Sequence, residues 1–210
     1  MIKRSVVIKR KNISFPEVDY KSVILFALFL CGIIIGSVTV LKSDGEFQNI
    51  IKSFTENFIK SKNELNFIKL FSGNVFVYMI FPLFAFLFGL CAVGLPLIYS
   101  IPFIYGLFYS IIVTFFISMY GTTGLGFSAI IIIPAVSVTA GVLMKCCSVS
   151  SAMSVDILSA LTGNDVKKSN NNGLIKEYVL KYVIYFLISI ISSLIMSGSF
   201  KLFGSLFNII

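Results

Sequence analysis

The feature that most constrains this chain is a stretch of 75 residues between Lys69 and Lys145 that contains no Asp, Glu, Lys or Arg. A soluble fold of this size needs a polar surface, and such a stretch cannot supply one. A helix that crosses a bilayer needs about 20 apolar residues, so the stretch has room for three crossings joined by tight turns. Only 12% of the whole chain is charged, about half the fraction of a typical soluble domain. The sequence therefore predicts an integral membrane protein.

Apolar runs and turn signals divide the chain into five predicted transmembrane helices. These make an all-α, polytopic membrane protein with one domain, residues 1–210. Glycine and proline between Gly94 and Pro102 predict one turn, Gly121–Gly124 predicts another, and Pro134 is expected to kink a helix. The predicted spans are residues 23–41, 75–93, 103–120, 125–144 and 178–198, with an outer loop at 42–74 and a cytoplasmic loop at 145–177.

The distribution of Lys and Arg predicts the orientation of these spans. Six cations precede the first span and five lie between Lys145 and Lys181, whereas six fall on the opposite side. Because cytoplasmic loops carry the excess of positive charge, we expect the N-terminus inside and the C-terminus outside. Tyrosines near predicted span ends, Tyr78 and Tyr178 among them, agree with the preference of these rings for the interface.

The outer loop contains one predicted amphipathic helix. Apolar residues fall on one face of it and charged residues on the other; the apolar face holds Phe47, Ile50, Ile51, Phe54 and Phe58, and the charged face holds Lys52, Glu56 and Lys60. Two interpretations stay open: the helix lies on the outer membrane surface, or it packs on the bundle. Since aromatic side chains dominate interface energetics, Phe47, Phe54 and Phe58 are the predicted docking residues for a partner.

Small residues recur at intervals of four in three predicted spans, a spacing that allows close helix packing. The first span has Gly32 and Gly36, the third has Gly106, Ser110, Thr114 and Ser118, and the last has Ser189, Ser193 and Ser197. The predicted helix-packing positions are the residues named here for the first and third spans, together with Gly94 and Pro96 at the turn. We interpret these rows of small residues as packing surfaces within the bundle. Packing against a second copy of the chain, in a homo-oligomer, or against a partner is the alternative.

The residue types argue against catalysis. The chain has no histidine, and the 75-residue stretch lacks the ionisable groups that serine or metal-dependent hydrolysis requires. The four cysteines show no C-x-x-C spacing. We therefore expect no catalytic residue, no cofactor and no metal site. Nucleic-acid binding is disfavoured because the cation excess reflects topology. A transporter or channel subunit for a small neutral solute is the alternative function.

The segment Phe88–Gly126 resembles the stage II sporulation protein M family. The likeness lies in the run from Phe88 through Gly94-Leu95-Pro96, followed by Gly106 and Gly121. Size, basic N-terminal tail, five spans and an extracytoplasmic segment are also similar.

The resemblance implies a non-enzymatic anchor in the bacterial plasma membrane, in contact with membrane lipid. It would recruit peptidoglycan-remodelling proteins, stage II sporulation proteins D and P, to the septum during engulfment. Many relatives carry polar residues after the proline equivalent to Pro134, in some a His and later a Glu. Here Ala135-Val136-Ser137 follow it, which agrees with a non-catalytic branch.

Overall fold

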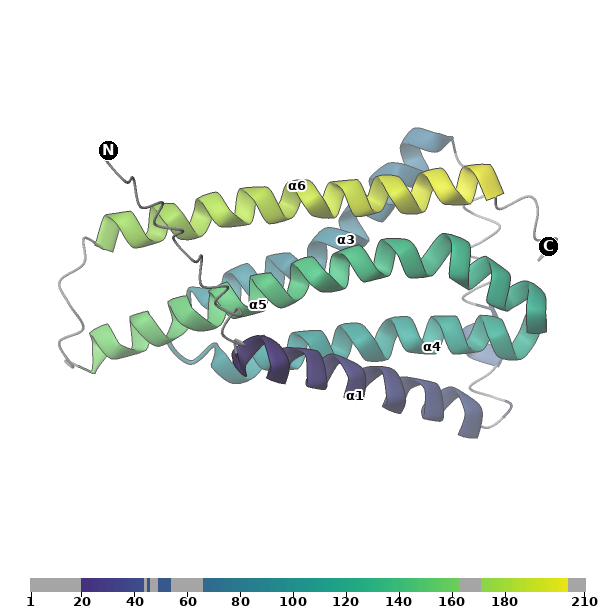
Figure 1. Ribbon diagram of the computed structural model, residues 1–210, viewed down its shortest axis with the longest axis horizontal. Coiled ribbons are helices and arrows are strands. Elements are labelled where there is room, and N and C mark those ends of the chain that lie inside the picture. Colours follow the sequence, from purple (N-terminus) through teal and green to yellow (C-terminus); the bar gives the residue numbers. More distant parts are fainter. Residues whose placement is uncertain (1–19, 44, 46–48, 54–65, 163–170, 204–210) are drawn as a thin grey trace, which may run out of the picture.

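The structure is a computed structural model in which the described residues are 20–43, 45, 49–53, 66–162 and 171–203. Every regular element in these ranges is a helix, which confirms the predicted all-α membrane fold. The long helices run side by side along one axis (Figure 1). They are α1 (Tyr20–Lys42), α3 (Phe67–Gly89), α4 (Leu95–Phe127), a π-helical turn η1 (Ser128–Ile132), α5 (Ile133–Leu161) and α6 (Asn171–Phe203).

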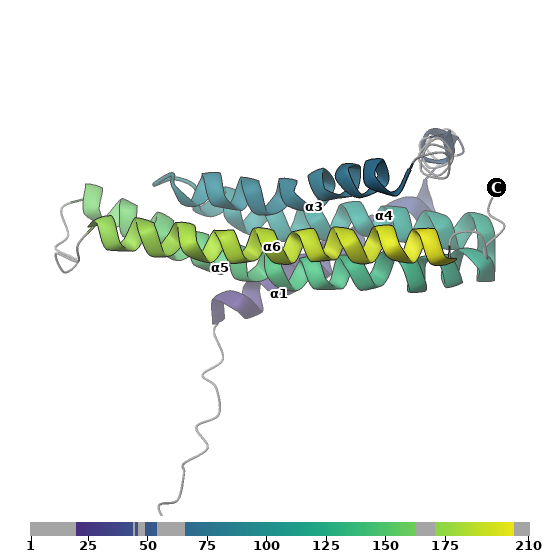
Figure 2. The ribbon, with the colours of Figure 1, turned by 90° about the horizontal axis from the view of Figure 1, so that it is seen from above.

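Four continuous helical segments in the described ranges are long and apolar enough to cross a membrane: Tyr20–Lys42, Phe67–Gly89, Leu95–Leu161 and Ile175–Phe203. The third of these has 67 residues and folds back on itself, so that α4 and α5 lie side by side in opposite directions (Figures 1 and 2). One continuous segment therefore supplies two neighbouring antiparallel helices of the bundle.

Two glycines make this reversal sterically feasible. Gly121 has φ +55° and ψ −128°, a conformation that glycine adopts readily because it lacks a Cβ. Gly124 lies against the preceding turn, where a Cβ would sit 2.7 Å from the carbonyl carbon of Phe116. The turn predicted at residues 121–124 coincides with the reversal.

The distortion expected at Pro134 takes the form of η1, immediately before it. Proline has no N–H and its ring crowds the carbonyl four residues earlier, so an α-helical turn cannot close there. The N–H of Ile133 instead donates to the carbonyl of Ser128, five residues back, which is the π-helical pattern. Within the described part of the chain, the buried Ser128 hydroxyl has no hydrogen-bond partner.

The helix boundaries differ from the boundaries of the predicted spans. α3 begins at Phe67 rather than residue 75 and ends at Gly89, so the turn lies at residues 90–94. Pro96 and Pro102 both belong to α4; Pro96 occupies the first turn, where a missing N–H leaves no bond unmade. Much of the predicted loops at 42–74 and 145–177 is helical, because α5 extends to Leu161 and α6 begins at Asn171. At the end of the bundle where α5 ends and α6 begins, these two helices project beyond the others (Figures 1 and 2).

The helices pack as two groups. α1 packs chiefly against α4, whereas α3, α5 and α6 pack around one another. Aromatic rings fill the centre, where Tyr105 is fully buried and Tyr109 lies 4.7 Å from it between ring centroids. The interfacial position predicted for Tyr78 is wrong: it lies midway along α3, buried, with its ring stacked on Tyr109.

Candidate functional site

α1 and α4 meet along a line of small residues that we call the α1–α4 seam (Gly32, Gly36, Ser37, Gly106, Ser110 and Thr114). A Cβ on Gly36 would lie 2.6 Å from the carbonyl oxygen of Leu107. A Cβ on Gly106 would lie 2.5 Å from the carbonyl oxygen of Phe29. The two backbones are therefore in contact, as small residues at this spacing permit.

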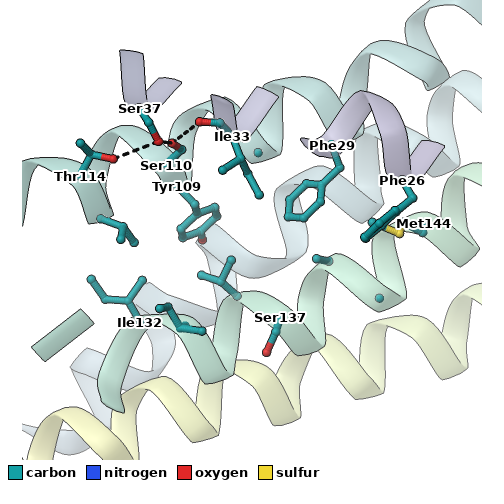
Figure 3. A pocket seen from close by; sticks show the side chains of 16 residues that line it. Phe26, Phe29, Ile33, Ser37, Tyr109, Ser110, Thr114, Ile132, Ser137 and Met144 are labelled. Atoms are coloured by element: carbon teal, nitrogen blue, oxygen red, sulfur yellow. Dashed lines mark hydrogen bonds between the residues drawn. The ribbon is translucent and has the colours of Figure 1, made fainter. Parts of the chain in front are cut away.

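Hydroxyl groups of the seam bond across the two helices. Ser110 Oγ donates to the carbonyl oxygen of Ile33 at 2.6 Å and lies 2.7 Å from Ser37 Oγ. Thr114 Oγ1 donates to Ser37 Oγ at 3.2 Å (Figure 3). Ser118, the last residue of the predicted row, is exposed and lies outside the seam. The seam thus joins two helices of the same chain.

The predicted serine row of α6 faces α3. Ser193 Oγ donates to the carbonyl oxygen of Phe71 at 3.2 Å, and Ser197 Oγ accepts a hydrogen bond from Asn74 Nδ2 at 2.9 Å. Asn74 is buried. Sequence analysis did not identify it, although an amide in an apolar helix is itself a signal, because in hydrocarbon it must find a partner.

A second group of hydroxyls, the Ser150 cluster (Ser150, Tyr178 and Tyr182), joins α3, α5 and α6. Ser150 Oγ donates to the carbonyl oxygen of Ala85 at 2.7 Å. The hydroxyls of Tyr178 and Tyr182 lie 3.1 and 2.5 Å from Ser150 Oγ. Sequence analysis missed this cluster because residue spacing does not give the relative rotation of α5 and α6, which brings its members together.

Glycines also set the geometry beside the Ser150 cluster. A Cβ on Gly89 would lie 2.9 Å from Ser150 Oγ, so only glycine leaves room for the hydroxyls. In the turn that follows, a Cβ on Gly94 would lie 2.9 Å from the carbonyl carbon of Phe88. Ser154 Oγ donates to the carbonyl oxygen of Cys91 at 2.7 Å and ties this turn to α5. Pro96, by contrast, is exposed at the start of α4.

A cavity of about 480 Å³ lies between α1, α4 and α5 (Figure 3). Its wall is almost wholly apolar, with Phe26 and Phe29 from α1, Val113 from α4, and Val136 and Met144 from α5. Ser37, Ser110 and Thr114 of the seam also border it. In the described part of the chain, no three His, Cys, Asp or Glu side chains come together as metal ligands.

The predicted docking residues Phe47, Phe54 and Phe58 lie outside the described residues. Residues 49–53 between them are helical, and Ser53 Oγ donates to the carbonyl oxygen of Asn49 at 3.0 Å. Ile50 of the predicted apolar face is 67% exposed. Docking through the three phenylalanines stays a prediction.

Comparison with known proteins gives one family. The family model for stage II sporulation protein M matches residues 25–201, which include all the membrane-crossing candidates except the first few residues of α1 and the last two of α6. No curated protein and no solved structure matches the chain significantly. The matched range contains the α1–α4 seam, the Ser150 cluster and the cavity. The chain is therefore a membrane protein that belongs to the stage II sporulation protein M family.

Proposed function

We propose that this sporulation-related membrane protein is a non-enzymatic scaffold that recruits peptidoglycan-remodelling proteins to the septal membrane during engulfment. Family membership provides the sporulation context. By the family resemblance, the recruited proteins are stage II sporulation proteins D and P. The main support for the scaffold role is that polar side chains inside the bundle bond one helix to another.

Inside the bundle, polar side chains hold helices together. Ser110 bonds α4 to α1, Ser150 bonds α5 to α3, and Asn74 bonds α3 to α6. Each of these groups is at least nine-tenths buried. A hydrogen bond between spanning helices contributes only about 0.6 kcal/mol on average, but several of them define one arrangement. A bundle fixed in this way suits a platform for other proteins.

The cavity bears on the alternative function of a small-solute transporter or channel subunit. A path for polar solutes requires donors and acceptors along its wall. Here the wall is apolar, and the bordering hydroxyls of Ser37, Ser110 and Thr114 already bond within the seam. This observation favours the scaffold over the transporter.

We further propose five crossings of the bacterial plasma membrane, with the N-terminus inside and the C-terminus outside. Lys21 and Lys42 bracket α1 and are about 31 Å apart along the helix axis at 1.5 Å per residue, close to the hydrocarbon thickness of about 30 Å. The reversal at Gly121 supports the proposal that α4 and α5 are two successive crossings.

Labelling of single cysteines tests this topology. In a chain whose own four cysteines are replaced by alanine, Arg10→Cys and Asn170→Cys are expected to resist an impermeant thiol reagent applied to intact cells. Lys62→Cys and Asn208→Cys are expected to react. The control is that every variant reacts once the membrane is permeabilised. Labelling at position 170 together with protection at position 62 would invert the topology.

Co-purification tests the scaffold itself. The tagged chain, extracted with mild detergent from sporulating cells, is expected to bring wall-remodelling proteins with it, identified by mass spectrometry. An unrelated tagged polytopic protein from the same cells is the control for non-specific capture. Recovery of the chain without such partners, combined with solute flux through vesicles containing the purified chain, would replace the scaffold by the transporter.

A further inference from the structure

We propose that the cavity between α1, α4 and α5 binds one acyl chain of a membrane phospholipid, whose phosphate group lies beside Lys145. The inference goes beyond the scaffold function and does not depend on it. It rests on the size and lining of the cavity, on the bonding of its polar atoms and on the charge at one end.

The cavity lies where α1 and α5 diverge on either side of α4. α1 packs extensively on α4 and much less on α5, so a space of about 480 Å³ remains between them. Sites for small molecules occupy about 300–1,000 Å³. Since all three helices are membrane-crossing candidates, the medium around this space is the hydrocarbon of the bilayer.

The serine and threonine hydroxyls at the cavity already have hydrogen-bond partners. Ser110 donates to the carbonyl oxygen of Ile33 and lies next to Ser37, and Ser137 Oγ donates to the carbonyl oxygen of Pro134 at 2.9 Å. A polar ligand would lose its own hydrogen bonds on entry, which costs free energy. A hydrocarbon chain would lose none. The lining therefore selects an apolar occupant.

The dimensions of the cavity favour a single acyl chain over a transmembrane helix as its occupant. The lining runs from Phe26 to Ser37 on α1, about 16 Å at 1.5 Å per residue. A volume of about 480 Å³ over that length gives a mean cross-section of roughly 30 Å². A helix 10 Å in diameter has a cross-section of about 80 Å². The space is thus narrower on average than a whole transmembrane helix, which favours an acyl chain as its occupant.

Charge at one end identifies the kind of lipid. Phe26 and Met144 lie together at one end of the cavity, with Ser37 and Thr114 at the other (Figure 3). Lys145 directly follows Met144 and is exposed. It lies roughly 36 Å along the helix from the reversal at Gly121, at 1.5 Å per residue, which places it at headgroup depth. An ammonium group there complements a phosphate.

Gly141 provides the means to test the site. It lines the cavity, and a Cβ on it would have no neighbour within 4 Å, so a side chain can be added there without a clash at its Cβ. Gly198 on α6 is equally unobstructed but lies outside the cavity. Gly141→Leu and Gly198→Leu are therefore a matched pair.

The experiment measures binding of dipalmitoyl phosphatidylglycerol to the full chain in detergent by native mass spectrometry. The unmodified chain and Gly198→Leu are expected to bind one lipid per chain at saturation. Gly141→Leu is expected to lose that binding while keeping its thermal stability. Lys145→Gln should weaken it about fivefold, as expected for removing one cation near phosphate. If Gly141→Leu does not accumulate, Ser137→Leu on the exposed rim of the same wall replaces it.

Three outcomes would overturn the proposal. Undiminished lipid binding by the cavity-filling variant would place the lipid elsewhere. Equal binding by the unmodified chain and Lys145→Gln would remove the phosphate contact. A dimer of the unmodified chain that Gly141→Leu converts to a monomer would show that a second copy occupies the cavity.

Discussion

Gly106→Leu is expected to remove most of the folded protein from the membrane. A Cβ at this position would already lie 2.5 Å from the carbonyl oxygen of Phe29 and 3.3 Å from the backbone nitrogen of Ile33. Backbone atoms cannot rotate away as side chains do, so α1 and α4 must separate along the seam. Overpacking a core typically costs about 1–3 kcal/mol, and a clash with backbone belongs at or above the upper end of that range.

The measurement is the amount of monodisperse protein extracted from membranes, together with its unfolding temperature in detergent. Gly198→Leu is the matched control, since a Cβ there meets nothing within 4 Å. Ser110→Ala is expected to be mild, because hydrogen bonds between spanning helices contribute about 0.6 kcal/mol on average. Normal yield and stability for Gly106→Leu would contradict close packing at the seam.

Phe54→Ala combined with Phe58→Ala is expected to abolish capture of wall-remodelling proteins while leaving the chain in the membrane. In the proposed topology, the segment of the predicted amphipathic helix is the sizeable polar element on the side where the proposed partners act. Its predicted aromatic face would offer the rigid apolar area that dominates binding. The membrane-crossing helices hold the protein in the bilayer independently of these two side chains.

The readout is co-purification at matched expression, with membrane flotation to verify insertion. The control changes the opposite face by charge reversal at Lys52, Glu56 and Lys60, which should reduce capture less because rim charges mainly tune association rate. Normal capture by the double phenylalanine variant would indicate that partners bind the membrane-crossing helices instead.

Several features were readable from residue spacing alone. The charge-free stretch between Lys69 and Lys145 predicted the membrane fold. Gly32, Gly36 and Gly106 were named as packing residues, and they do lie where α1 meets α4. Spacing identifies one face of one helix, however, and does not say how far a neighbour follows it. For this reason Ser118 was assigned to a row that the α1–α4 seam does not include.

Helix ends and long-range polar contacts were not readable in this way. Apolar runs locate the part of a helix that lies in hydrocarbon, whereas α5 continues to Leu161 and is tied to the α3–α4 turn by Ser154. The Ser150 cluster depends on the relative rotation of three helices. Tyr178 was predicted as an interfacial residue, and spacing alone did not indicate that it and Tyr182 are buried against Ser150.

The α1–α4 seam has a consequence for the order of events during synthesis. Ser37 and Ser110, which bond across it, are 73 residues apart in the chain, and α3 is made between them. At about 5–20 residues per second, α1 waits roughly 4–15 s before its partner emerges. During that interval the glycine face of α1 lacks the α4 backbone that covers it in the folded chain, and lipid, the emerging α3 and the α1 of another nascent chain can all contact it. The rate of elongation between the two helices thus sets how long this face is open to other contacts.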